Sequence, residues 1–202
     1  MKIQLYQVDA FTSERFSGNP AAVCLLEEWI DDGTLQSIAA ENNLSETAFL
    51  VKNDAGFDLR WFTPVVEVAL CGHATLASAF VLFNYRGWAE PSIRFRTRKS
   101  GELAVARAGG LYEMDFPARP VQGIDPPPGL LDALGVRGKD VYGSEEDVMV
   151  VLESEKRVRA LTPDMGMLEK VDCRGIIATA RGDRSDFVSR FFAPRVGVPE
   201  DP

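Results

Sequence analysis

The chain has 202 residues, a length that can bury one large core or two small ones. Its 46% apolar and 26% charged residues are typical of an ordinary soluble globular protein. The formal net charge of −8 argues against a nucleic-acid partner, because binding to a phosphate backbone requires a basic surface.

Short apolar or alternating runs predict a strand-rich first half. Strands are expected at residues 3–10, 21–26, 47–51, 58–62, 93–97, 103–106 and 112–116. A helix is expected from about Thr34 to Asn42, beginning at Asp32 or Gly33. The two glycines within residues 107–111 indicate a hairpin turn.

A second helix is predicted to begin near Gly72 and to end by Gly87. Residues 74–82 are apolar on nearly every side of this helix. Such a helix is expected to be enclosed by the rest of the fold, because a helix on a surface keeps one polar face. The surrounding short strands therefore indicate a sheet that curls around it.

Five prolines in residues 117–128 predict a linker, because proline continues neither a strand ladder nor a helix interior. We expect a first domain at residues 1–117, a linker at 118–128 and a second domain at 129–202. In the second domain, helices are expected at residues 130–135 and 162–171. Strands are expected at residues 148–152, 157–160, 176–180 and 187–192.

The two domains have the pattern of a duplication. Residues 62–72 and 192–202, which lie 130 positions apart, share a Phe-x-Pro turn and two valines. The strands predicted before them, at residues 47–51 and 176–180, are separated by nearly the same number of positions. The enclosed helix of the first domain follows Cys71, and its counterpart would follow Asp201. We therefore expect the second domain to be incomplete, with its central helix beyond Pro202.

Glu46 stands between a polar helix end and an apolar strand. A carboxyl group drawn into the interior has a raised pKa, which suits general acid/base catalysis. The alternative is a strand cap or a salt-bridge partner.

His73 is the only histidine and stands at the start of the enclosed helix, after Gly72 and before Ala74. The amides of a helix start favour an anion such as a substrate carboxylate, and small neighbours allow a ligand to approach. Gly72 and Ala74 are therefore candidate substrate-binding residues, and Asn19 in the G-N-P run is a third candidate. The alternatives are a cap or core role for His73 and a turn role for Asn19.

Cys71 and Asp201 occupy equivalent positions of the repeat. A thiol at a helix start can become a proton-abstracting thiolate, although a free cysteine is more often a small buried residue. Asp201 is a candidate site residue, the alternative is a helix cap, and both roles can hold at once.

The cysteines and the N-terminus predict a cytoplasmic protein. Residues 1–9 lack the apolar core of a signal peptide, and no apolar run has the length of a membrane span. Cys24, Cys71 and Cys173 include no C-x-x-C pair, so reduced thiols and no zinc site are expected. No nucleotide, flavin or pyridoxal motif occurs, so no organic cofactor is expected.

Together, these motifs resemble the phenazine-biosynthesis (PhzF-like) family in order and spacing. The resemblance covers the whole chain. It rests on V-D-A-F-T (8–12), G-N-P-A-A-V (18–23), S-E-T-A-F (45–49), R-W-F-T-P (60–64), E-V (67–68), C-G-H-A-T (71–75), F-A-P (192–194) and E-D-P (200–202).

The resemblance implies the α+β fold of diaminopimelate epimerase, with two pseudo-symmetric lobes and an active site between them. Each lobe is a curled, mainly antiparallel sheet around a central helix. By match to the family motifs, Glu46 is the general acid/base, and His73 and Asp201 assist proton transfer or hold the substrate. Family members are typically cytoplasmic homodimers that need no metal or organic cofactor.

Three functions remain open from the sequence. The first is an isomerase acting on a small carboxylic acid, since the best-characterised family activity isomerises trans-2,3-dihydro-3-hydroxyanthranilate. The second is a racemase or epimerase that uses Cys71, although the opposing repeat position is Asp201 and not a second thiol. The third is a small-molecule binding protein without catalysis.

Overall fold

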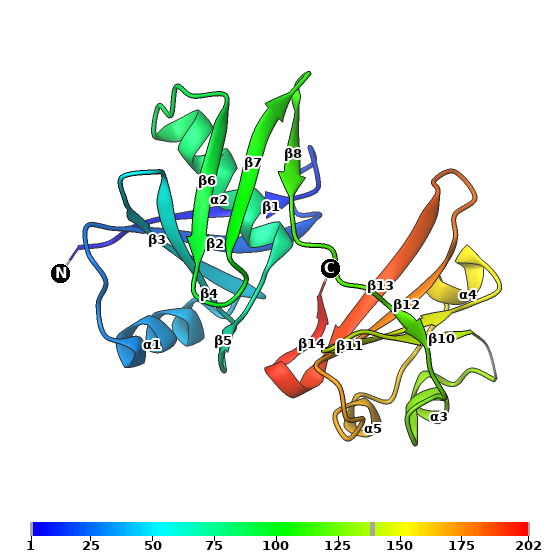
Figure 1. Cartoon of the computed structure of the whole chain (residues 1–202). Helices are drawn as coiled ribbons and strands as arrows, with labels where there is room; N and C mark the ends of the chain where they lie inside the picture. The colour runs from blue at the N-terminus through cyan, green and yellow to red at the C-terminus, as the bar shows by residue number, and fades with distance from the viewer. Residues whose placement is uncertain (1, 138–139, 202) are drawn as a thin grey trace. The chain divides into compact units, whose positions relative to one another are not determined.

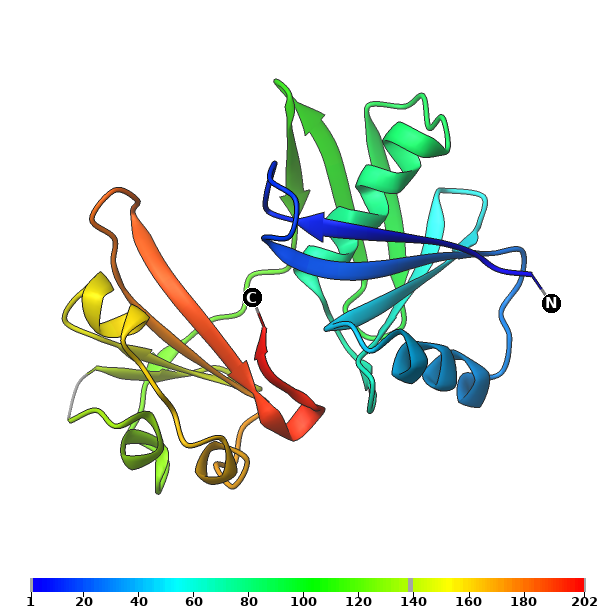
Figure 2. The same ribbon diagram turned by 180° about the vertical axis from the view of Figure 1, so that it is seen from behind.

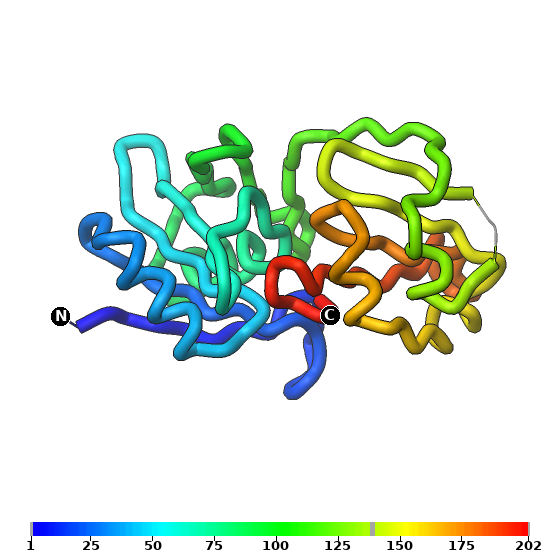
Figure 3. Tube along the Cα trace, turned by 90° about the horizontal axis from the view of Figure 1, so that it is seen from below, coloured from blue at the N-terminus to red at the C-terminus, as the bar shows by residue number. Residues whose placement is uncertain are grey.

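A computed structural model describes residues 2–137 and 140–201; Pro202, the last residue of the E-D-P motif, lies outside this part. The chain divides into two compact units, Met1–Pro117 and Ala118–Pro202. The Cα trace of each unit can be followed by its colour in Figure 3, from blue to green and from green to red.

The first unit is built on a mixed sheet with the order β1-β2-β3-β4-β6-β7-β8, in which β5 also pairs with β4. β2 is parallel to β3, and β4 is parallel to β6. Parallel neighbours need a crossover, and α1 (Asp32–Asn42) and α2 (Gly72–Tyr85) lie in these two connections. The strands are β1 (Gln4–Ala10), β2 (Asn19–Leu26), β3 (Glu46–Lys52), β4 (Phe57–Phe62), β5 (Glu67–Val68), β6 (Ser92–Thr97), β7 (Glu102–Ala108) and β8 (Leu111–Asp115).

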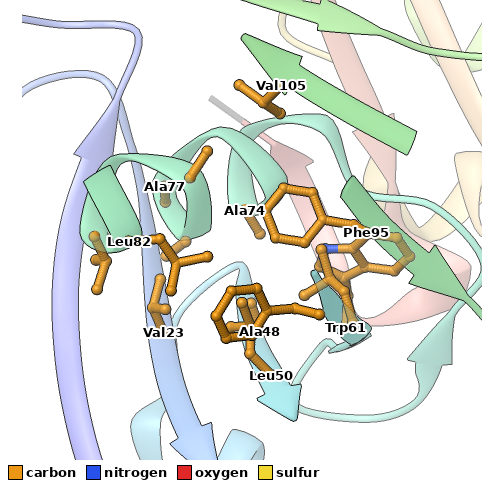
Figure 4. Close-up of a cluster of buried hydrophobic side chains, with 14 of the residues drawn as sticks. Val23, Ala48, Leu50, Trp61, Ala74, Ala77, Leu82, Phe95 and Val105 are labelled. Atoms are coloured by element: carbon orange, nitrogen blue, oxygen red, sulfur yellow. The ribbon is translucent and has the colours of Figure 1, made fainter. Parts of the chain in front are cut away.

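Helix α2 lies within the curled sheet of the first unit (Figure 1). Ala74, Ala77 and Leu82 belong to the same core as Val23 and Leu50 of the strands (Figure 4). Small side chains on the helix let its backbone approach the strands closely. The enclosure predicted from its apolar surface is confirmed.

Helix α1 covers the other face of this sheet (Figure 2). Leu35 and Ala39 of the helix pack with Phe49 of β3 in a second cluster. The helix begins at Asp32, one of the two predicted starts, and the carboxylate of Asp31 caps it by accepting a hydrogen bond from the backbone N–H of Thr34 at 2.9 Å.

Gly109 and Gly110 turn the chain between β7 and β8, and both have positive φ angles (56° and 91°). A two-residue hairpin turn of this kind needs such angles, so the predicted turn is confirmed. Gly87 also has a positive φ of 67° and follows the end of α2, as predicted for a stop signal.

The second unit contains a six-stranded sheet with the order β14-β13-β12-β11-β10-β9. Three short helices, α3 (Leu130–Leu134), α4 (Glu155–Arg159) and α5 (Met165–Leu168), share its hydrophobic core. On the opposite face, Met149, Ile177 and Phe191 are half-buried. The strands are β9 (Gln122–Gly123), β10 (Val141–Gly143), β11 (Asp147–Val151), β12 (Gly175–Arg181), β13 (Phe187–Ala193) and β14 (Val198–Asp201).

The two units repeat one topology, as the sequence predicted. Strands β1 to β5 and strands β10 to β14 are each joined in order by antiparallel, parallel, antiparallel and antiparallel pairings. The guanidinium of Arg60 lies 5.0 Å from the ring centre of Phe62, and that of Arg190 lies 5.0 Å from the ring centre of Phe192. This equivalent cation–π contact supports the duplication independently of the Phe-x-Pro turn.

Two predictions for the second unit were wrong. The predicted strand at residues 157–160 lies in and after helix α4, because the hydroxyl of Ser154 caps it by accepting from the N–H of Arg157 at 3.3 Å. The predicted helix at residues 162–171 is reduced to the single turn of α5. Asp164 caps this turn by accepting from the N–H of Met167, and Gly166 within it weakens further helical propagation.

Several short strands were not predicted. Gln122–Gly123 lies in the predicted linker and pairs with β10, so this part of residues 118–128 belongs to the second sheet. Strands β5, β10 and β14 have two to four residues, too few for an alternating pattern to be recognised. Within the described ranges, no helix combines the length and the apolar character needed to cross a bilayer.

Candidate active site

Glu46 is the first residue of β3, and its side chain enters the interior on the α2 side of the sheet. Ala48 and Leu50 follow at two-residue intervals and belong to the core around α2, and alternate residues of a strand share one face. Glu46 lies opposite Ala21 in the parallel pairing with β2. It is 7% exposed, so the prediction of a buried carboxyl group is confirmed.

His73 lies in the first turn of α2 and is also buried. Its Nε2 atom is 3.3 Å from Oε2 of Glu46. The crossover through α2 thus brings together the side chains of Glu46 and His73, which stand 27 residues apart in the sequence. A titratable ring and a carboxyl group in direct contact, both shielded from water, can exchange a proton.

Cys71 caps the N-terminus of α2 and lies on the other side of the imidazole ring. Its Sγ atom is 3.5 Å from Nδ1 of His73. When the carboxyl group of Glu46 is ionised and the ring is neutral, Nε2–H donates to Glu46 and Nδ1 accepts from the thiol of Cys71. The three residues therefore form one chain of polar contacts, which we call the Cys–His–Glu cluster.

Thr75 holds the start of α2 in place. Its hydroxyl donates to the backbone carbonyl of Cys71 at 2.6 Å, and its backbone N–H donates to the same oxygen at 3.2 Å. This role of Thr75 was not predicted from the sequence, although a threonine hydroxyl often donates to the backbone carbonyl four residues earlier. The first N–H groups of a helix have no intrahelical acceptor, so the end of α2 at Gly72 is positively polarised.

The predicted substrate-binding residues have different surroundings. Asn19 begins β2 and is 3% exposed, and it shares the α2-facing side of the strand with Ala21. Gly72 is half-buried, and a Cβ there would lie 3.6 Å from the ring of Phe116, an ordinary contact distance. The side chain of Ala74 is fully buried in the core, so only its backbone could reach a ligand.

Asp201 ends strand β14 in the second unit, where it pairs in register with Phe191. It is half-buried. The structure therefore brings Glu46, Cys71 and His73 into one cluster in the first unit and places Asp201 in the other unit.

The Cys–His–Glu cluster also offers three types of metal ligand. One carboxylate oxygen of Glu46, Sγ of Cys71 and one ring nitrogen of His73 lie within 4.8 Å of one another. The spacing of the cysteines in the sequence did not predict this donor set, because strand β3 supplies Glu46 from a distant part of the chain.

Arg60 carries a separate ion-pair network on the α1 side of the sheet. Its guanidinium donates to both carboxylate oxygens of Glu67 at 2.8 and 2.9 Å and to Asp32 at 2.9 Å. These contacts lower the pKa of both carboxyl groups. A cavity of about 300 Å³ beside this network is lined by three arginines and by the acids Asp32 and Asp58. Each of the three arginines is paired with a carboxylate.

The chain matches the family model described as "Phenazine biosynthesis-like protein" (PhzC-PhzF) over residues 8–202. It is 54% identical over its whole length to an uncharacterized isomerase of Pseudomonas aeruginosa, covering 77% of that protein. The crystal structure of a PhzF family protein from Enterococcus faecalis matches the whole chain with a TM-score of 0.90 and 48% identity, over 77% of that protein.

The fold extends to more distant proteins. A hydroxyproline epimerase from Agrobacterium vitis matches 98% of the chain and 72% of its own length, with a TM-score of 0.60 and 10% identity. At this identity the match concerns the fold alone. The predicted diaminopimelate epimerase-like α+β fold is confirmed, and the chain belongs to the phenazine biosynthesis-like (PhzC-PhzF) family.

Proposed function

We propose that the protein is a cofactor-independent isomerase that moves a proton within a small carboxylic acid, with Glu46 as the general acid/base. The observation that carries this proposal is the contact between Oε2 of Glu46 and Nε2 of His73 at 3.3 Å, in a site where both side chains are buried. The name of the 54% identical relative, an uncharacterized isomerase, agrees with this reaction class.

In the proposed mechanism, the carboxylate of Glu46 removes a proton from an activated carbon of the substrate. The C–H bond breaks, its electron pair shifts the neighbouring double bond, and the carboxyl group of Glu46 then returns the proton to another carbon of the same molecule. His73 supports the changing charge on Glu46 through Nε2. The polarised start of α2 at Gly72 binds the carboxylate of the substrate and stabilises the charge that develops.

We extend the proposal to two further residues. Asn19 would hold a polar group of the substrate, because it lies buried on the same face of the sheet as Glu46. Asp201, which matches the aspartate of the family's E-D-P motif, would supply a second polar contact to the substrate. A substrate similar to trans-2,3-dihydro-3-hydroxyanthranilate offers both the carboxylate and the unsaturated carbon that this mechanism needs.

Glu46→Gln tests the role of the carboxyl group. The amide keeps the shape of the side chain but cannot carry the proton, so incorporation of solvent deuterium into the substrate should fall by roughly 10²- to 10⁴-fold, the usual contribution of a general acid/base. Mass spectrometry of the substrate in D₂O measures this exchange. Glu41→Gln, at an exposed position of α1, is the matched control and should exchange at the original rate. Undiminished exchange in Glu46→Gln would rule out Glu46 as the base.

A second candidate function is a cysteine-dependent racemase or epimerase. It is favoured by one observation, the contact of the Cys71 thiol with the imidazole of His73 at 3.5 Å, which is a geometry that can activate a thiol. The two functions differ in their response to iodoacetamide. Loss of activity through alkylation of Cys71, prevented by substrate, together with inversion at one carbon of the product, would favour the racemase.

A further inference from the structure

We propose that the Cys–His–Glu cluster binds a thiophilic divalent metal ion such as Zn²⁺, with Sγ of Cys71 and Nδ1 of His73 as its protein ligands. The ion would be an inhibitor rather than a resident cofactor, because it would occupy the groups that the proposed isomerase reaction uses. Its effect on catalysis therefore rests on the proposed function, whereas the binding itself does not.

The distance between the two ligand atoms fits one bound ion. Zinc lies about 2.3 Å from a cysteine sulfur and about 2.0–2.1 Å from a histidine nitrogen, so a tetrahedral angle between them separates the ligand atoms by about 3.5 Å. Sγ of Cys71 and Nδ1 of His73 are 3.5 Å apart in the structure. The separation of the two ligand atoms is therefore the one that a single bridging ion requires.

Glu46 provides the outer contact that a metal-binding histidine requires. A histidine that binds a metal through one nitrogen almost always donates its other ring N–H to a carboxylate, a carbonyl group or water, which fixes the tautomer and the ring orientation. Nε2 of His73 lies 3.3 Å from Oε2 of Glu46. The contact with Glu46 thus leaves Nδ1, on the side of Cys71, as the nitrogen that can bind the ion.

The charges of the cluster also match a divalent cation. With the ion bound, a thiolate at Cys71 and a carboxylate at Glu46 would together balance the two positive charges of one Zn²⁺ ion. Burial of a charge is costly unless the charge is compensated, and all three residues are buried. Because the thiol must lose its proton to bind, one proton is released for each ion and the affinity rises with pH.

Co²⁺ and Zn²⁺ binding to the full chain, reduced and without a polyhistidine tag, tests the proposal. Equilibrium dialysis should find one ion per chain, and Co²⁺ should produce the near-ultraviolet charge-transfer band of a cobalt–thiolate bond. In Cys71→Ser this band should disappear. Glu46→Gln should keep the band but weaken binding by roughly 10- to 100-fold, the usual cost of losing an outer contact. Cys173→Ser, at the half-buried cysteine of the second unit, should bind like the unchanged protein.

His73 gives a second measurement that does not depend on a variant. It is the only histidine, so ¹⁵N-labelled histidine reports this ring alone. Zn²⁺ should shift the Nδ1 resonance strongly, while Nε2 remains protonated. An unchanged histidine spectrum at saturating Zn²⁺, or a cobalt–thiolate band that persists in Cys71→Ser, would overturn the metal site. Neither result would affect the isomerase proposal, which the deuterium exchange of Glu46→Gln tests separately.

Discussion

His73 connects the two chemical groups of the site, because each nitrogen of its ring contacts a different titratable side chain. A neutral imidazole carries one proton, so the protonation state of Glu46 at Nε2 determines whether Nδ1 accepts from Cys71 or donates to it. The proposed acid/base chemistry and the proposed metal binding would therefore compete for the same ring. The sequence alone placed His73 and Cys71 together at a helix start, and strand β3 adds the third partner.

The three cysteines differ in their surroundings. Burial raises the pKa of the Cys24 thiol to about 12, and burial together with the charge of Asp147 raises that of Cys173 to about 11. We expect iodoacetamide at pH 8 to leave both residues unmodified in the folded protein, since about one Cys173 thiol in a thousand is ionised there.

Peptide mass spectrometry after brief labelling checks this prediction. The control is the same reaction in denaturant, where Cys24 and Cys173 should both be alkylated at the rate of an ordinary thiol. Equal labelling rates of Cys173 in the folded and denatured protein would contradict the shielding of this thiol.

At the scale of single elements, alternation along β3 explains how one strand serves two cores. Ala48 and Leu50 face α2, whereas Phe49 faces α1. Glu46 continues the α2-facing series, which is why its carboxyl group meets the start of that helix. The alternation was hidden in the sequence, because residues 46–51 are buried on both faces of the strand and residues 48–51 form a continuous apolar run.

Two neighbouring alanines of α1 offer a matched test of its packing. Ala39 is 1% exposed and packs against the sheet, whereas Ala40 is exposed. Ala39→Leu should lower the free energy of unfolding by about 1–3 kcal/mol, because extra atoms in a filled core force neighbouring side chains apart. Ala40→Leu should change it by less than about 0.5 kcal/mol.

Tryptophan fluorescence during urea unfolding measures this difference. Trp29, Trp61 and Trp88 are the only tryptophans and all belong to the first unit, so the signal reports the unit that contains α1. Equal effects of the two substitutions would mean that α1 does not pack on the sheet as described.

At the scale of the whole molecule, the duplication is clearer in the topology than in the sequence. The Phe-x-Pro turns at residues 62–64 and 192–194 are one of the few identities between the repeats. The strand pairings of both units nevertheless agree in order and direction. Backbone hydrogen bonding depends on which strands are neighbours, so it tolerates the replacement of most side chains.

The balance of charges predicts how the protein responds to acid. Arg60 lowers the pKa of Glu67, and Arg96 lowers that of Asp58. A carboxyl group with a lowered pKa stabilises the folded state above its unfolded pKa, and this stabilisation is lost as the pH falls through the folded pKa. The free energy of unfolding should therefore decrease as the pH is lowered below about 4.5, the ordinary value for glutamate.

Arg60→Gln tests the origin of this acid sensitivity. The variant should be less stable at pH 7, and its stability should depend less on pH below 4.5, because the pKa of Glu67 then returns toward its ordinary value of 4.5. Arg94→Gln is the control, since Arg94 and its partner Glu102 are both exposed and 4.0 Å apart. A pH profile of Arg60→Gln parallel to that of the unchanged protein would contradict this assignment.

Local sequence signals were sufficient to predict an element when its own residues carry a clear pattern, such as an apolar surface or a turn-forming pair. The all-round apolar surface of residues 74–82 predicted an enclosed helix, and Gly109 with Gly110 predicted a hairpin. They were insufficient for residues 157–160, where a Ser154 cap favours a helical turn over the strand suggested by a brief alternation. In such a short segment, one capping hydrogen bond has more influence on whether a helix or a strand forms than an alternating pattern of a few residues.

The sequence by itself determined the family motifs, the enclosed helix, the duplicated order of elements and the candidates Glu46 and His73. Only the tertiary structure decided that Cys71 and Glu46 contact opposite nitrogens of one imidazole ring. The physical reason is that periodicity and capping are local properties of the chain. The distance between a strand residue and a helix start depends instead on how the crossover returns the chain to the sheet.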